Sequence, residues 1–170
     1  MNKKTPHKFQ EKMELTYEQY FHVLYDGMVQ LARELERVLG RERAFEIIGK
    51  AREKAAVESV KKQIAKRGPI NNFEDFKAFM KEEQRSNPMS SYTGTATYPE
   101  ETPKKWVAHA TECIIAKTFK DLDATDLGYI MCCHTDFAAA RAYHPKIKLR
   151  RTKTLMQGDN CCDHTFCWEE

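Results

Sequence analysis

Two short segments in the C-terminal third contain most of the residues that could do chemistry. The first is Cys132-Cys-His-Thr-Asp136, and the second covers residues 151–166. Thiols, carboxylates, imidazoles and cations cost free energy at core-facing positions, so their presence among apolar neighbours calls for an explanation. We therefore take these segments as the candidate site and ask which elements position them.

The first segment falls within a helix predicted over residues 125–143. Ile130, Cys133 and Phe137 recur at steps of three and four, so Cys133 lies on the buried stripe. Asp136 follows Cys133 by three positions and faces nearly the same side. Cys133 could be a nucleophile and Asp136 a general base or a group that orients water. The alternative for Asp136 is a solvated aspartate on the flank of the helix.

The second segment begins in a strand predicted over residues 147–156. Alternation places Arg151 and Lys153 on the same face as Ile147 and Leu149. A guanidinium and an ammonium at a buried face predict a pocket for the carboxylate of a substrate. The alternative is an edge strand, where basic residues often prevent pairing with other chains.

A closing strand is predicted over residues 161–168. Its more apolar face carries Cys162, His164, Phe166 and Trp168, so Cys162 and His164 are expected to face the core or a pocket. Pairing with the preceding strand would place Cys162 beside the cations, which lower a thiol pKa. The alternative is that Cys162 is a small core hydrophobe.

A zinc site competes with thiol chemistry, because Cys113, Cys133, Cys162 and His164 could converge from four elements. The local spacings do not match a zinc knuckle, and no phosphate loop, serine elbow or zincin motif is present. We therefore expect no cofactor and no metal. The most informative test of this candidate site is whether Cys113, Cys133, Cys162 and Asp136 line one cavity.

Bulk properties restrict the function further. The 170 residues fit one domain, and a net charge of +3 is too small for a dedicated nucleic-acid binder. A mean hydropathy of -0.70 and the lack of a long apolar run exclude a membrane-spanning helix. The basic N-terminus is not a secretory signal, so the six cysteines are expected to be reduced in the cytoplasm.

The predicted elements indicate an α+β fold, with long N-terminal helices packed on a mostly antiparallel sheet of about four strands with an inserted helix. Residues 1–14 are expected to be a flexible lead-in and residues 15–170 a single domain. Helices are predicted over residues 16–38, 42–66, 114–122 and 125–143. Thr16 and Gln19 form a capping-box pattern at the first of these, and Asn72 is expected to cap the start of another helix. Strands are predicted over residues 90–98, 106–113, 147–156 and 161–168. The first helix has an apolar stripe consisting of Tyr17, Phe21, Leu24, Met28, Leu31, Leu35 and Val38.

Several motifs resemble the L-2-amino-thiazoline-4-carboxylic acid hydrolase family. They are Glu112-Cys113, Cys133-x-x-Asp136, Arg151-Thr-Lys-Thr-Leu and Gly158-Asp-x-x-Cys162-Asp163. The resemblance implies that L-2-amino-thiazoline-4-carboxylate is opened to N-carbamoyl-L-cysteine. It implies catalytic roles for Cys133, Asp136 and Cys162, and a place for Asp163 in the substrate site. His164 stands where the family usually has an aromatic residue.

The sequence thus predicts a hydrolase of a cyclic amidine that carries a carboxylate. Arg151 and Lys153 would hold the carboxylate, with Asp163 and His164 beside them. Either Cys133 or a water activated by Asp136 would attack the amidine carbon. The partners expected are a small-molecule carboxylate substrate and, as an option left open, a second copy of the chain, but no nucleic acid and no membrane. The alternative is a non-catalytic small-molecule or zinc-binding domain, similar to the 4-vinyl-reductase-like ligand-binding modules.

Overall fold

Three long helices form the N-terminal half of the chain in the computed structural model, which describes residues 13–87 and 93–169. They are α1 (Tyr17–Leu39), α2 (Arg41–Arg67) and α3 (Phe73–Ser86). The predicted capping box is confirmed, because Thr16 and Gln19 exchange hydrogen bonds at the start of α1. Asn72 caps α3 by accepting from the Asp75 amide, again as predicted. The expected lead-in lies outside the described residues, except for residues 13 and 14.

The apolar stripe predicted for α1 is largely wrong. The buried residues of this helix are Phe21, Tyr25, Val29 and Ala32, whereas Leu31 and Val38 are 64% and 62% exposed. The helix is turned so that Tyr25 packs on Phe119, with ring centroids 4.7 Å apart. Periodicity shows that a helix has an apolar face, but the neighbouring elements decide which residues are covered.

A four-stranded sheet dominates the C-terminal half. Its strands are β1 (Gly94–Glu101), β2 (Lys105–Cys113), β3 (Ile147–Arg150) and β4 (Cys162–Trp168), in the spatial order β1-β2-β4-β3 with every neighbouring pair antiparallel. Between β2 and β3 the chain forms α5 (Ile114–Asp121), α6 (Thr125–Gly128), a π-helical turn (Tyr129–Cys133) and α7 (Thr135–Tyr143). The α+β prediction is confirmed.

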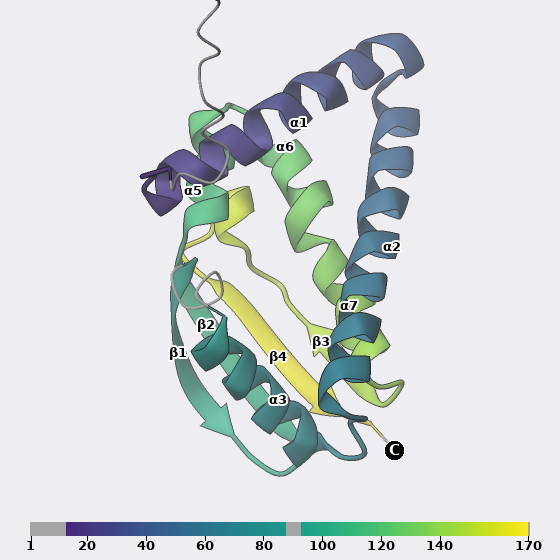
Figure 1. Cartoon of the computed structure of the whole chain (residues 1–170), viewed down its shortest axis with the longest axis vertical. Coiled ribbons are helices and arrows are strands. Elements are labelled where there is room, and N and C mark those ends of the chain that lie inside the picture. Colours follow the sequence, from purple (N-terminus) through teal and green to yellow (C-terminus); the bar gives the residue numbers. More distant parts are fainter. Residues whose placement is uncertain (1–12, 88–92, 170) are drawn as a thin grey trace, which may run out of the picture.

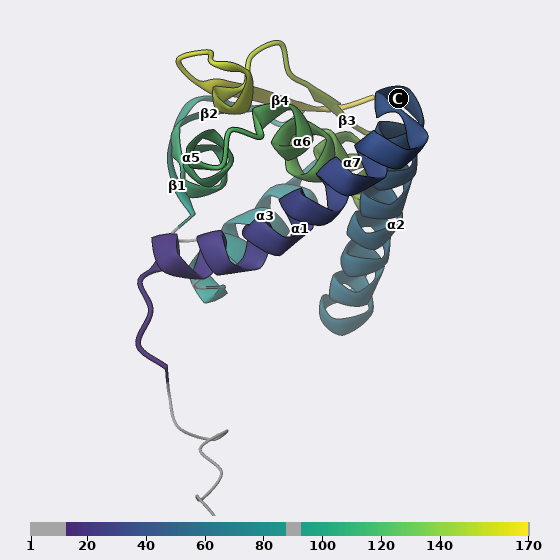
Figure 2. The ribbon, with the colours of Figure 1, turned by 90° about the horizontal axis from the view of Figure 1, so that it is seen from above.

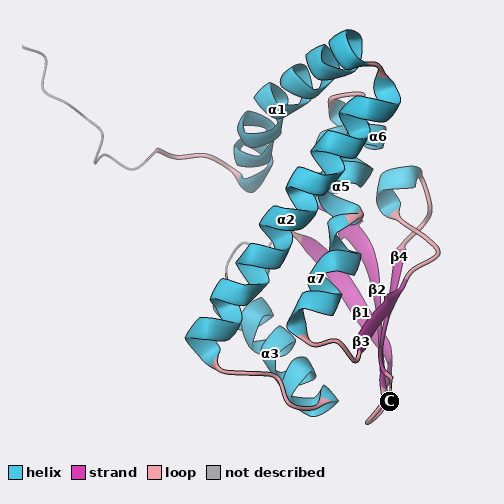
Figure 3. Ribbon diagram, turned by 90° about the vertical axis from the view of Figure 1, so that its right-hand side faces the viewer, coloured by secondary structure: helices cyan, strands magenta, loops and turns pink. Residues whose placement is uncertain are grey.

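The helices gather on one side of the sheet, as two views show (Figures 2 and 3). α7 lies between α2 and the sheet, while α1 crosses one end of the molecule (Figure 1). Two apolar clusters hold these layers together. One joins α1, α5 and α6 around Phe119 and Leu127, and the other places Phe76 of α3 against Trp106 and Ile147 of the sheet.

The strand predicted over residues 147–156 is too long, because β3 ends at Arg150. Beyond it, carboxylates take the backbone donors that a neighbouring strand would otherwise bind. Asp163 accepts from the amides of Thr152 and Lys153, and Asp159 accepts from the amide of Thr154. The chain therefore leaves the sheet and forms a 3₁₀ turn at Leu155–Gln157. None of the helices in the described ranges has the length and apolar character needed to cross a bilayer.

Candidate functional site

A cavity of about 260 Å³ lies between the sheet and the helical segment 129–143. We call it the thiol cavity, because four cysteines line it. Its lining includes Cys113, Cys132, Cys133, Asp136, Arg151, Cys162 and His164. The residues on which the prediction depended, namely Cys113, Cys133, Cys162 and Asp136, therefore converge on one cavity from β2, the π-helical turn, α7 and β4.

The face predicted for the closing strand is confirmed. Cys162 is buried, and Cys162 and His164 both line the thiol cavity. Their register partners on β2 are Ala110 and Ala108. Small residues at these positions, and at Ala139 on α7, leave open space that larger side chains would fill.

The π-helical turn brings two adjacent cysteines to the cavity. In an ordinary α-helix Cys132 and Cys133 would point about 100° apart, whereas here both line the thiol cavity. The turn is marked by the His134 amide, which donates to the Tyr129 carbonyl at 2.8 Å. π-Helical turns of this kind occur frequently at functional sites.

Side chains from three elements satisfy the carbonyls of this turn. Arg52 of α2 donates to the Met131 carbonyl at 2.9 Å, and Thr135 donates to the Cys132 carbonyl at 2.6 Å. Arg151 donates to the Cys133 carbonyl at 2.9 Å. These contacts tie the turn to α2, to α7 and to the loop after β3, and so hold it in place.

Arg151 is the electrostatic centre of the site, and its side chain is only 2% exposed. Its Nη1 donates to Asp136 Oδ2 at 2.6 Å, and its guanidinium lies over the Phe137 ring at 5.1 Å. Burial alone would lower the pKa of Arg151, but the adjacent carboxylate of Asp136 outweighs this effect and raises it. The pair places a fixed cation beneath a half-exposed carboxylate at the cavity wall.

His164 completes this cluster. Its Nε2 lies 3.3 Å from Arg151 Nη1 and 3.6 Å from Asp136 Oδ2. Because a guanidinium can only donate, the contact with Arg151 is a hydrogen bond in the tautomer whose Nε2 carries no proton. Both contacts of Asp136 use Oδ2, and within residues 13–87 and 93–169 no hydrogen bond is made to Oδ1. That oxygen can accept from a water or a ligand in the cavity.

Burial raises the pKa of three of the four thiols of the cavity. It is the largest cause that raises the pKa of Cys133, and the negative charge of Asp136 adds to it despite the opposing charge of Arg151. Burial also raises the pKa of Cys132 and of Cys162, although the Leu155 amide donates to the Cys162 sulfur at 3.2 Å. The lowered pKa expected for Cys162 beside the cations is therefore wrong, because burial outweighs the Leu155 amide and the positive charge of Arg151.

Two of the residues predicted to bind substrate lie elsewhere. Lys153 is exposed, and Asp163 holds the loop after β3 through Thr152 and Lys153. Neither lines the thiol cavity. Of the predicted site residues, the structure therefore brings together Cys133, Asp136, Arg151, Cys162 and His164 and leaves Lys153 and Asp163 outside.

The sequence prediction missed Gln84 and Glu112 as residues of the cavity wall, and gave Cys132 no role there. Gln84 lies on α3, about fifty positions from Asp136, and no local pattern signals such a contact. Glu112 lies beside a β-bulge, where its carboxylate accepts from the Thr95 hydroxyl. A bulge alters the simple alternation of a strand, so the direction of Glu112 could not be derived from periodicity.

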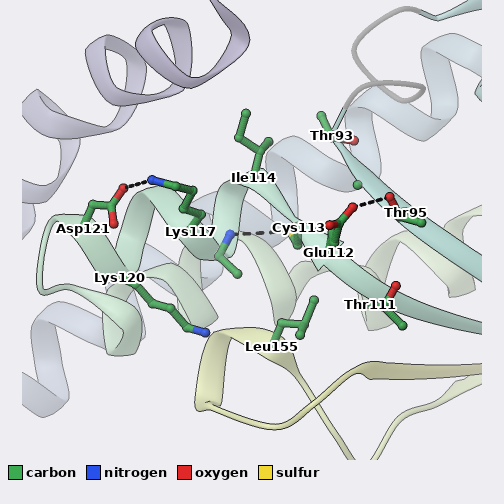
Figure 4. Close-up of a pocket in the computed structure, with 12 residues that line it drawn as sticks. Thr93, Thr95, Thr111, Glu112, Cys113, Ile114, Lys117, Lys120, Asp121 and Leu155 are labelled. Atoms are coloured by element: carbon green, nitrogen blue, oxygen red, sulfur yellow. Dashed lines mark hydrogen bonds and ion pairs between the residues drawn. The ribbon is translucent and has the colours of Figure 1, made fainter.

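A second depression, of about 660 Å³, adjoins the thiol cavity and is shown in Figure 4. It shares Glu112 and Cys113 with the thiol cavity and is flanked by Lys117 and Lys120 of α5. Lys117 points to Asp121, with which it forms an ion pair at 2.6 Å. Although this depression is larger, it contains none of Cys133, Asp136 and Arg151, so we place the candidate site in the thiol cavity.

The metal alternative requires donors within one coordination sphere. In the described part of the chain, only Glu18, His22 and Asp121 offer at least three such donor atoms close together, on the surface between α1 and α5. The cysteines of the thiol cavity do not form such a group. The geometry of the cavity thus gives no support to the zinc-binding alternative.

The fold is α+β, and a cavity lined by thiols and a carboxylate lies between its sheet and its helices. The family model for L-2-amino-thiazoline-4-carboxylic acid hydrolase matches residues 17–166, so the chain belongs to this family. No curated protein matches the chain.

Two solved structures are similar to it. One is the phenol-responsive sensory domain of the transcription activator PoxR with phenol, at 12% identity and a TM-score of 0.54, over 93% of this chain and 77% of that one. The other is a trafficking protein particle complex subunit 3 from Naegleria fowleri covalently bound to palmitic acid, at 11% identity and a TM-score of 0.49, over 90% of this chain and 95% of that one. At these identities the PoxR likeness shows a shared fold alone.

Proposed function

We propose that the chain hydrolyses a cyclic amidine that carries a carboxylate, with L-2-amino-thiazoline-4-carboxylate as the type of substrate. The observation that carries this proposal is the convergence of Cys133, Asp136 and Arg151 on one cavity in a member of this family. A carboxylate, a fixed cation and thiols around a small cavity suit a small acid with an electrophilic carbon.

In the proposed reaction, water adds to the amidine carbon between the ring sulfur and the two nitrogens. Asp136 accepts the proton of that water through Oδ1, while Arg151 holds Oδ2. The carbon–sulfur bond then breaks, the ring sulfur takes up a proton as a thiol, and the former amidine carbon becomes the carbonyl of a ureido group. The substrate carboxylate would lie at the edge of the Arg151 guanidinium, beside His164.

Water is favoured over Cys133 as the nucleophile, because burial and Asp136 raise the pKa of that thiol. Cys133 and Cys162 would then shape the cavity and exclude bulk water. Attack by Cys133 would instead need Asp136 to remove the thiol proton as the bond forms. The two routes give the same product, but only the second requires the sulfur of Cys133.

The first prediction tests the reaction itself. The purified chain should release thiol from L-2-amino-thiazoline-4-carboxylate, with a product heavier by one water. Asp136→Asn should cut turnover by about 10²–10⁴, the usual share of a general base. Cys133→Ser should retain turnover within about tenfold if water attacks, and should abolish it if the sulfur attacks. Cys161→Ser is the matched control, because Cys161 does not line the cavity.

The second candidate function is binding without turnover. The solved relative that shares this fold is a sensory domain with phenol. The protonated state of the buried thiols is compatible with a passive ligand cavity. Stoichiometric binding of the thiazoline carboxylate without thiol release would support this candidate and reject the hydrolase.

A further inference from the structure

The thiol cavity continues along the sheet into a second cavity of about 330 Å³, which we call the aromatic chamber. The two share Gln84, Ala96, Ala110, Asp136 and His164 in their lining, so they meet at Asp136 and His164. Beyond this junction the lining becomes aromatic and apolar, with Tyr98, Trp106, Tyr143 and Phe166. None of the described residues that line the chamber is a Lys, Arg or Glu, so the chamber suits an uncharged group.

The rings of the chamber offer a ligand their apolar surfaces. Trp106 is almost fully buried, at 2% exposed, and its ring stacks on Tyr98 with centroids 5.3 Å apart. Its Nε1 is closed to a water-sized molecule and has no hydrogen-bond partner among the described residues, so it does not face the open space of the chamber. At Trp106 a ligand in the chamber therefore meets ring carbons rather than a hydrogen-bond donor.

The size of the thiol cavity supports the same conclusion. At about 260 Å³ it accommodates a carboxylate and a small ring, and it is smaller than the usual range of about 300–1,000 Å³ for ligand pockets. The aromatic chamber would remain empty beside an unsubstituted thiazoline carboxylate. Apolar space of this kind gains free energy when an apolar group fills it.

We propose that the substrate of this chain is a carboxylic acid with a planar, uncharged substituent that occupies the aromatic chamber. This inference rests on the proposed function, since it places the carboxylate beside Arg151. It names the substrate class more narrowly than the family does.

The test is a binding series measured by calorimetry on the full chain with acetate and two aryl acids, phenylacetate and 4-acetylphenylacetate. Both aryl acids should bind roughly 10- to 100-fold more tightly than acetate, because their ring leaves water. Equal affinities for acetate and phenylacetate would overturn the proposal.

A pair of substitutions on α7 tests the location. Ala139 lines the aromatic chamber, whereas Ala142 lines a groove against α2. Ala139→Leu should remove the preference for the aryl acids and keep acetate binding, and Ala142→Leu should change neither. If Ala139→Leu still binds the aryl acids more tightly than acetate, the aryl ring binds elsewhere and its assignment to the chamber is wrong. If the aryl preference holds but no thiazoline carboxylate is hydrolysed, the proposed function fails while the chamber assignment stands.

Discussion

At the scale of single residues, Arg151 connects the fold to the proposed chemistry. It binds the Cys133 carbonyl, the Asp136 carboxylate and His164 from one guanidinium. A lysine could keep the charge but could not reach three acceptors in one plane. The residue therefore both fixes the π-helical turn and orients the carboxylate of Asp136.

We expect Arg151→Lys to raise the KM for a carboxylate substrate by roughly 10- to 100-fold, the equivalent of about 1.5–3 kcal/mol for a charged hydrogen bond. It should also lower the free energy of unfolding by about 1–3 kcal/mol, because the Cys133 carbonyl loses its partner. Steady-state kinetics and urea titration measure the two effects separately.

Arg150→Lys is the matched control for this change. Arg150 is the neighbouring residue, its side chain is 72% exposed, and it pairs only loosely with Glu169 at 3.3 Å. Both measurements should remain near wild type in this variant. An unchanged KM in Arg151→Lys, with stability lost, would make Arg151 a structural residue without a role in binding the carboxylate.

At the scale of elements, the π-helical turn depends on close packing at its start. Gly128 ends α6, and a Cβ placed there would lie 2.5 Å from Phe119 Cγ and 2.6 Å from Met156 Sδ. Both neighbours are buried in the first apolar cluster. There is thus no room for even a methyl group where α6 passes into the turn.

Gly128→Ala should therefore destabilise the protein by about 1–3 kcal/mol, the usual cost of overpacking. It should also displace Cys132 and Cys133, which alkylation of the two thiols in native protein would report as faster labelling. Gly27→Ala is the control, since nothing lies within 4 Å of a Cβ at Gly27 in α1. An alanine there should stabilise the helix by about 0.5–1 kcal/mol. Equal stability of the two variants would contradict the packing argument.

The helices and strands also show which features could be predicted from the sequence and which could not. The faces of β4 and the caps of α1 and α3 were predicted correctly, because alternation and capping are local properties. The π-helical turn was not predicted, since its carbonyls depend on Arg52 and Arg151, which are far away in the sequence. The end of β3 was missed for the same reason. The amides of Thr152 and Lys153, which follow β3, donate to Asp163 of β4, and this contact lies ten or more positions away in the sequence.

The candidate site, too, could be predicted from the sequence only in part. Cys133, Asp136, Cys162 and His164 could be placed on the correct side of their elements from spacing alone. The aromatic chamber could not be predicted, because it lies where alanines of the paired strands β1 and β2 face alanines of α7, which is distant in the sequence. Empty space leaves no local pattern in a sequence.

At the scale of the whole molecule, Asp126 joins the N-terminal helices to the half that carries the site. Its carboxylate binds Arg33 of α1 at 2.8 Å and Arg41 of α2 at 2.7 Å. Burial would raise the pKa of Asp126, but Arg33, the Leu127 amide and Arg41 together outweigh it and lower the pKa to about 2. One carboxylate thus holds three helices at the end of the molecule where α1 crosses (Figure 1).

The lowered pKa makes this contribution dependent on pH in a defined direction. An aspartate in an unfolded chain has a pKa of about 3.9, so the stabilising effect is fully present above about pH 4. It should decrease as the pH falls from about 4 through the folded pKa of about 2, where the carboxylate takes up a proton. Asp126→Asn should therefore cost about 1–2 kcal/mol at pH 7, a range that allows for solvent screening of a side chain that is 30% exposed.

Urea titrations of wild type and Asp126→Asn between pH 7 and pH 2 provide the test. The difference in unfolding free energy should stay constant down to about pH 4 and approach zero near pH 2, because the protonated aspartate resembles the amide. Asp26→Asn is the control, since Asp26 is exposed on α1 and bonds to Gln30 of the same helix. That variant should stay within about 0.5 kcal/mol of wild type at every pH. A difference for Asp126→Asn that persists unchanged at pH 2 would mean that the carboxylate charge does not hold the three helices together.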